Sequence, residues 1–151
     1  MRPAPLDLRN RRGGLVDLEF IVQYLMLRDA ARTPQILRYD IGAAIAALGA
    51  AGILEPQAVQ TLGDALNLLR AARGFLTLLF DGVPDAEALA GPAGATLAHC
   101  VGAVDFPRLD ADISAACAGV LAWYDRLVAV PAQQAIQSTA AQSSTEGGVA
   151  K

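Results

Sequence analysis

The stretch RRGGLVDLEFIVQYLML, residues 11–27, decides the fold class of this chain. No helix breaker follows its paired glycines up to about residue 31, so this length favours a helix over a strand. At about 100° per residue, two apolar sides emerge. One side carries Leu15, Leu18, Ile21, Val22 and Leu25, and the other carries Val16, Phe20 and Leu27. We therefore predict a central helix that packs on two sides.

Helix signals continue along the chain. We expect helices over about residues 33–51 with a break near Asp40, 55–80, 95–101 and 106–130, and a loop with one short turn over 83–95. Pro131 should end the last helix, and residues 131–151 are polar and poor in large apolar side chains, which predicts a flexible tail. No stretch alternates convincingly as a strand. The predicted class is all-α, an irregular bundle of about five helices over residues 13–130.

The composition argues against three classes of function: nucleic-acid binding, membrane spanning and a structural zinc site. The net charge is −3, which argues against a nucleic-acid surface, because such surfaces need clustered positive charge. The uncharged stretch at residues 41–54 is far shorter than the roughly 20 residues that span a membrane. His99, Cys100 and Cys117 fall short of the about four ligands of a structural zinc site. We expect two free, buried thiols in a bacterial-type cytosol.

Two acids interrupt the first apolar helix. Asp17 and Glu19 are two residues apart, which on a helix places their side chains roughly 200° apart, so one metal ion cannot easily take both. They must have different roles. One interpretation pairs Asp17 with Arg28 or Tyr24 and gives Glu19 hydrogen bonds from a neighbouring helix.

A second interpretation concerns the start of this helix. Paired glycines allow another backbone or a phosphate to approach closely, and a helix N-terminus offers free N–H groups. Gly13 and Gly14 stand beside Asp17 and the basic residues Arg9, Arg11 and Arg12. Together they could face the phosphates of a nucleotide. The simpler alternative is that the glycines only turn the chain into the helix.

The sequence GGLVDLEFIVQYLML resembles the Gly-Gly-hydrophobic-x-Asp/Glu-hydrophobic-Glu-Phe signature of the glutamine synthetase adenylyltransferase family. In that family the signature opens the helical domain that follows a nucleotidyltransferase domain. The further matches resemble the C-terminal, adenylylating half, and the resemblance covers residues 7–129. These further matches include Val16-Asp17, Gln23-Tyr24-Leu25, Thr33-Pro34 and Arg38-Tyr39.

The resemblance implies a role in nitrogen regulation. Family enzymes transfer AMP from ATP to a tyrosine of glutamine synthetase, and the complete enzyme uses ATP and Mg²⁺ under control by glutamine and the P-II signal protein. It implies that residues 1–12 are a basic lead-in from a preceding nucleotidyltransferase domain, in a cytoplasmic bacterial enzyme. The residues expected nearest the nucleotide are Gly13, Gly14, Asp17 and Glu19, with Arg11 and Arg12 as candidate phosphate contacts.

Two departures from the family pattern bear on activity. Residues 71–76 replace a His-Arg-Leu-Gln-like stretch, and the combined Gly-Ser plus Asp-x-Asp motif that holds magnesium and ATP does not occur. Because nucleotidyl transfer depends on metal ions that neutralise developing charge, this chain should not catalyse alone. The alternative is a free-standing helical module for protein interaction or oligomerisation. A metal-dependent helical hydrolase would need several ligands on facing helices, which the single histidine and scattered acids disfavour.

Overall fold

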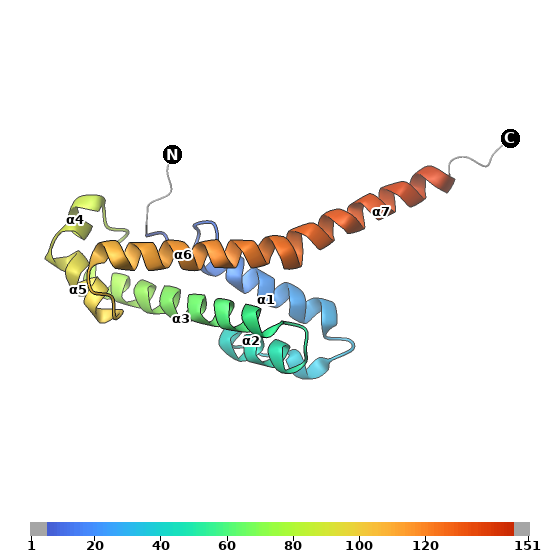
Figure 1. Ribbon diagram of the computed structural model, residues 1–151, viewed down its shortest axis with the longest axis horizontal. Helices are drawn as coiled ribbons and strands as arrows, with labels where there is room; N and C mark the ends of the chain where they lie inside the picture. Colours follow the sequence, from blue (N-terminus) through green and yellow to red (C-terminus); the bar gives the residue numbers. More distant parts are fainter. Residues whose placement is uncertain (1–5, 147–151) are drawn as a thin grey trace.

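The computed structural model describes the backbone of residues 6–146, which forms helices and no strand (Figure 1). The predicted all-α class is confirmed. The elements in order are α1 Leu15–Asp29, η1 Pro34–Ile36, α2 Ile41–Ala50, α3 Pro56–Leu79, α4 Ala86–Ala90, α5 Pro92–Cys100, α6 Phe106–Tyr124, η2 Asp125–Ala129 and α7 Val130–Glu146. Here η1 is a 3-10 helix and η2 a single π-helical turn.

Helix α1 is central, because it packs against α2, α3 and α6. Its predicted inner side is buried, with Leu18, Ile21 and Val22 inaccessible to solvent. The predicted second contact is wrong within the described residues: Val16, Phe20 and Leu27 are 41%, 48% and 79% exposed. Helical periodicity identifies an apolar side but cannot tell whether anything in the same chain covers it. A second apolar face of α1 therefore remains open.

The core is completed by α3 and α6, which lie side by side along most of the bundle (Figure 1). Their buried side chains recur at helical spacing and meet those of α1 and α5 in one apolar cluster. The main contributors are Leu62, Leu66, Leu69, Leu97, Leu109, Ile113 and Val120. At the α7 end, Arg126 of η2 pairs with Glu55, the residue before α3, at 3.0 Å and stacks over the Trp123 ring.

Helices α2, α4 and α6 each begin at an aspartate whose carboxylate accepts a backbone N–H three residues on. Asp40 caps α2, Asp85 caps α4 and Asp105 caps α6, each at 2.8 Å. Such caps satisfy N–H groups that the first helical turn leaves unpaired. They explain why the predicted break near Asp40 and the predicted helix start at Phe106 are both observed.

The segment after α3 is more helical than predicted. Residues 83–95 hold α4 and the start of α5, which begins at Pro92 rather than at Ala95. Gly94 makes this compact pair possible, because a Cβ there would lie 1.8 Å from the carbonyl oxygen of Leu89. The prediction of a loop failed because such close packing is a tertiary effect.

The helix that begins at Phe106 does not end at Pro131, so that prediction is wrong. Proline cannot donate a hydrogen bond and its ring crowds the preceding turn of a regular α-helix. The π-turn η2 precedes it, with the Val130 N–H bonded to the Asp125 carbonyl oxygen, and the helix continues as α7. The described side chains from Ala132 to Gln142 are all exposed, and α7 projects away from the bundle (Figure 1). The flexibility expected of residues 131–151 stays a prediction, and residues 147–151 lie outside the described residues.

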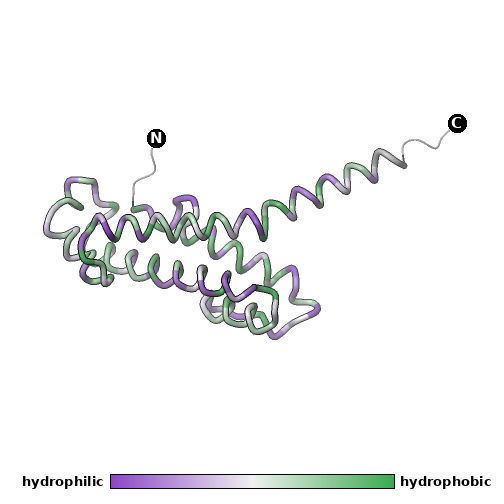
Figure 2. The backbone as a smooth tube through the Cα atoms, in the orientation of Figure 1, coloured by the Kyte–Doolittle hydropathy of each residue, from purple (hydrophilic) through white to green (hydrophobic). Residues whose placement is uncertain are grey.

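Residues 106–142 form one helix that is long and apolar enough, by length and composition alone, to cross a membrane. Figure 2 shows apolar positions interleaved with polar ones along it. Its first part, α6, packs its apolar positions into the core of the bundle. Burial in the core accounts for part of this apolar character, since 28% of the most apolar window is buried.

Candidate functional site

The turn that leads into α1 is organised by Asp17. Its Oδ2 accepts the backbone N–H of Gly13 at 2.7 Å, and Nε of Arg12 lies 3.9 Å from the same oxygen. An acid in the first turn that reaches back to an N–H ahead of the helix acts like one half of a capping box. The interpretation that paired Asp17 with Arg28 or Tyr24 is therefore wrong. Asp17 lies beside the glycines and Arg12, as the second interpretation expected.

Both glycines are required by close packing. Gly13 has φ +75°, and a Cβ there would lie 2.1 Å from the carbonyl oxygen of Cys117 in α6. At Gly14 a Cβ would lie 2.6 Å from the carbonyl oxygen of Leu8. The pair thus lets the turn lie directly on the backbone of α6 and on the preceding residues. This is the simpler role that the sequence left open.

Three N–H groups at the start of α1 already have partners. The amides of Gly14, Leu15 and Val16 donate to the carbonyl oxygens of Arg11, Leu8 and Arg9, at 2.8, 3.0 and 3.1 Å. A phosphate could reach these N–H groups only if the lead-in moved away. The side chain of Arg12 is 78% exposed and points its charge to the surface, whereas that of Arg11 is half-buried. Proximity of this turn to a nucleotide stays a prediction.

Glu19 differs from its predicted environment. It is half-buried, and in the described residues its carboxylate has no hydrogen bond or ion pair. The expected hydrogen bond from a neighbouring helix is therefore absent there, and that prediction is wrong. Next to Glu19 lies Phe20, whose ring contacts that of Tyr124 at a centroid distance of 6.0 Å. Glu19 thus borders the open face of α1.

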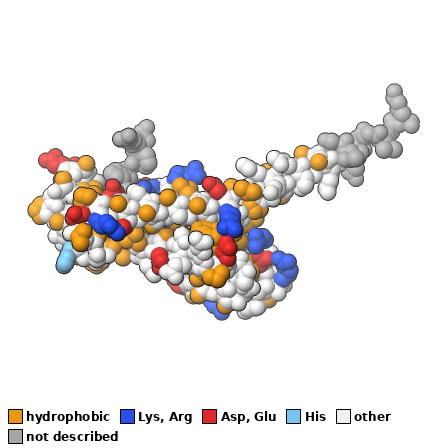
Figure 3. All heavy atoms as spheres, viewed as in Figure 1, with side chains coloured by type: hydrophobic (Ala, Val, Ile, Leu, Met, Phe, Trp, Pro, Cys, Tyr) orange, Lys and Arg blue, Asp and Glu red, His pale blue; other side chains and the backbone are white. Residues whose placement is uncertain are grey.

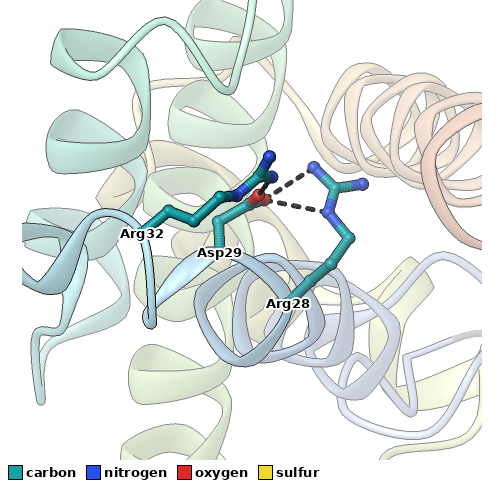
Figure 4. Close-up of polar contacts among 3 residues, drawn as sticks. All are labelled: Arg28, Asp29 and Arg32. Atoms are coloured by element: carbon teal, nitrogen blue, oxygen red, sulfur yellow. Dashed lines mark hydrogen bonds and ion pairs between the residues drawn. The ribbon is translucent and has the colours of Figure 1, made fainter.

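The most organised polar cluster was not predicted. Asp29 is buried at the end of α1, and Oδ2 accepts Nε and Nη2 of Arg28 at 2.9 and 2.7 Å while Oδ1 accepts Nη2 of Arg32 at 2.5 Å (Figure 4). Burial by itself raises the pKa of Asp29, but hydrogen bonds and charges from both arginines outweigh it and lower the pKa. The Asp29 carbonyl oxygen also accepts the N–H groups of Arg32 and Thr33. The cluster therefore fixes the end of α1.

A sequence signal for this cluster did exist. Asp29 and Arg32 are three residues apart, a spacing that brings side chains together near a helix end. Arg28 and Asp29 are adjacent, and neighbouring residues on a helix do not face each other, so their bond depends on the bend of the long arginine side chain. For this reason periodicity assigned Arg28 to Asp17.

The thiols and acids provide no metal centre in the described residues. No three of the His, Cys, Asp and Glu side chains there are grouped so that they could hold an ion. Cys100 and Cys117 are both free, as predicted, but only Cys117 is buried. Burial raises the pKa of the Cys117 thiol, while the charge of Arg11 opposes this rise and that of Asp17 adds to it.

One Asp-x-Asp triplet is present, at Asp110-Ala111-Asp112, without a Gly-Ser ahead of it. It lies within helix α6, where residues two apart point roughly 200° from each other. Asp112 is paired with Arg108 at 3.0 Å. This triplet therefore does not form the paired carboxylates of a nucleotidyltransferase site.

Comparison with known proteins identifies the family. Residues 4–107, which run from the lead-in to the first turn of α6, match the family model described as GlnD PII-uridylyltransferase. The chain belongs to this family. No solved structure matches it.

Curated relatives of this family member are named bifunctional glutamine synthetase adenylyltransferase/adenylyl-removing enzymes. That of Xanthobacter autotrophicus is 34% identical over 130 residues, which is 84% of this chain and 13% of the relative. That of Caulobacter vibrioides is 33% identical over 122 residues, 81% of this chain and 12% of the relative. That of Hahella chejuensis is 44% identical over 70 residues, 46% of this chain and 7% of the relative. The resemblance inferred from residues 13–27 is confirmed, and the chain spans about one eighth of the Xanthobacter relative's length.

Proposed function

We propose that this chain is the C-terminal helical domain of a glutamine synthetase adenylyltransferase, placed after a nucleotidyltransferase domain. The observation that carries the proposal is the match of more than four fifths of the chain to relatives named bifunctional glutamine synthetase adenylyltransferase/adenylyl-removing enzyme. The complete enzyme would transfer AMP from ATP, with Mg²⁺, to a tyrosine of glutamine synthetase in the bacterial cytoplasm. Glutamine synthetase would be its protein substrate, and glutamine and P-II its controls.

The open face of α1 supports a role as one wall of a larger enzyme. Val16, Phe20 and Leu27 lie within about 40° of one another around the helix, and all three are exposed. Exposed large apolar side chains that share a face are typical of an interaction site. We propose that this face packs on the nucleotidyltransferase domain.

The turn at residues 11–19 lies at one end of this face and would line the nucleotide site. Asp17 would act indirectly, by holding the Gly13 N–H and so fixing the turn on α6. Two charged groups of this turn would face a nucleotide or its magnesium. They are the exposed guanidinium of Arg12 and the carboxylate of Glu19, which has no partner among the described residues. The chain alone would not catalyse.

A chimera tests the proposal. The segment of the Xanthobacter relative that this chain matches is replaced by this chain, and AMP transfer to glutamine synthetase is measured with ATP and Mg²⁺. We expect the chimera to transfer AMP and the isolated chain to show no transfer above a no-protein control. A folded chimera without transfer would contradict the proposal and favour a free-standing interaction module.

Matched variants test the face of α1. Leu27→Glu should abolish transfer in the chimera, because Leu27 is 79% exposed on the same face and the substitution places a charge in the proposed contact with the catalytic domain. Leu78→Glu is the control, since Leu78 of α3 is also a large apolar residue and is 80% exposed. Thermal melts of the isolated chain should be nearly unchanged by both substitutions. Equal activity of the two chimeras would show that the face of α1 is not the contact.

A further inference from the structure

The charge of the molecule is unevenly distributed along its length. Residues 81–112, which form α4, α5 and the start of α6, carry six acids and one arginine, so their formal charge is −5. The whole chain carries only −3, and the remaining residues therefore carry +2. Figure 3 shows acidic side chains among hydrophobic ones over the end formed by α4 and α5, on the left. This end of the bundle is distinctly acidic.

The same end contains an apolar groove with a volume of about 560 Å³. Its walls come from α4, the start of α5 and the start of α6, and its largest apolar side chains are Leu89 and Phe106. Asp105 and Asp110 supply its charged groups. A volume of this size accommodates several apolar side chains of a partner.

The negative charge beside the groove is only partly compensated. The carboxylate of Asp105 caps α6 through the N–H of Arg108, and the side chain of Arg108 is paired with Asp112. Asp110 is half-buried in the groove, and among the described residues it has no hydrogen bond or ion pair through its side chain. A cation on a partner could therefore pair with Asp110 without displacing an existing contact.

We propose that this groove binds a basic amphipathic helix of a partner protein. The apolar side of such a helix would enter the groove with residues spaced three and four apart, and its lysines or arginines would meet Asp110 and its acidic surroundings. An extended peptide is disfavoured, because the described residues offer no strand edge for it to join. The chain's own α7 does not supply this partner, since it has no lysine or arginine. The inference does not rest on the proposed function.

The test uses the intact chain and two model peptides of about 18 residues, a length of roughly five helical turns. Both carry leucines at helical spacing, one with lysines and the other with glutamates at the remaining positions. Fluorescence anisotropy should show the Leu/Lys peptide binding at least about tenfold more tightly than the Leu/Glu peptide. NMR chemical shifts should change at α4, α5 and the start of α6.

Three variants locate the site. Asp110→Lys reverses the charge in the groove, and Ala90→Trp fills the groove from an exposed position. Asp125→Lys makes the same charge change in η2, where Asp125 is exposed and far along the α6 helix. We expect the first two to weaken binding of the Leu/Lys peptide about tenfold and the third to change it less than about twofold.

The proposal is overturned by any of three results. The first is that the Leu/Lys peptide fails to bind. The second is that Asp110→Lys and Asp125→Lys weaken its binding equally, as a non-specific charge effect would. The third is that the NMR shift changes lie outside the groove. Thermal melts of each variant confirm that the fold is retained. The proposal is supported if Asp110→Lys loses binding with an unchanged melting temperature while Asp125→Lys still binds the peptide.

Discussion

Substituting Gly13 by alanine tests how closely the turn ahead of α1 lies on α6. The new Cβ would lie 2.1 Å from the carbonyl oxygen of Cys117, far inside van der Waals contact, and Gly13 also has φ +75°. The neighbour is the backbone of α6, which cannot rotate away as a flexible side chain can. The turn must therefore move away from α6. This movement also weakens the hydrogen bond from the Gly13 N–H to Asp17.

Two other glycines separate the backbone and packing contributions to the free-energy cost of Gly13→Ala. Gly52 has φ +74°, and a Cβ added there would have no atom within 4 Å, so Gly52→Ala should cost only the left-handed backbone, about 1–2 kcal/mol. Gly74 lies inside α3 with open space around it, so Gly74→Ala should stabilise by about 0.5–1 kcal/mol. Gly13→Ala adds an overpacking cost of about 1–3 kcal/mol to the backbone cost, for a total of about 2–5 kcal/mol.

The assay is urea and thermal unfolding of all three variants beside the parent chain. For a chain of this length 1 kcal/mol shifts the midpoint by about 2–4 °C, so Gly13→Ala should melt at least about 4 °C lower and Gly74→Ala slightly higher. If Gly13→Ala costs no more than Gly52→Ala, the turn does not lie on α6 and the reasoning fails.

Three further predictions concern the acids and the tail. Asp17→Ala should cost about 1.5–3 kcal/mol of stability, because it removes a charged acceptor from the Gly13 N–H. Glu19→Ala should change the stability by about 0.5 kcal/mol or less. Urea unfolding measures both, and the opposite order would contradict the site geometry. Asp29→Asn should destabilise the chain at pH 7. The pKa of Asp29 in the folded chain lies below its usual value of 3.8. The stability that the carboxylate contributes is therefore complete above about pH 4 and is lost as the pH falls through the folded pKa. Urea unfolding between pH 7 and pH 3 should therefore show the gap to the parent chain narrowing below about pH 4, and a constant gap would refute the role of the charge. Truncation after Ala132 should leave the thermal midpoint within about 2 °C, because the described side chains that it removes are exposed; a larger drop would mean that α7 docks on the bundle.

Sequence reasoning was reliable where the signals are local. The all-α class, the buried side of α1 and the starts of α3 and α6 each depend on residues a few positions apart, such as Pro56 at the first turn of its helix or Asp105 as a cap. The family could also be inferred from sequence, because the signature at residues 13–20 is short and contiguous. Such features need no knowledge of what packs against them.

The partners of polar groups required the tertiary structure. Helical spacing puts Arg28 on the same side of α1 as Asp17, but about 16 Å of helix separates them, and Arg28 pairs instead with the adjacent buried carboxylate of Asp29. The glycines could have faced a phosphate, but only the position of α6 shows that Cys117 occupies the space beside Gly13. Sequence spacing defines which pairs are possible, and the arrangement of the helices selects among them.

Periodicity, caps and a contiguous motif are all written within a few helical turns, so residue order alone was enough to place most helices, the buried side of α1 and the family. Three other features became visible only in the folded chain: the other side of α1 is open, α4 and α5 enclose an apolar groove with α6, and the last helix passes through Pro131. The first depends on where α2, α3 and α6 lie around α1, and the second on how three consecutive helices fold against one another. The third depends on the π-turn that replaces the regular α-helical hydrogen bonds ahead of the proline.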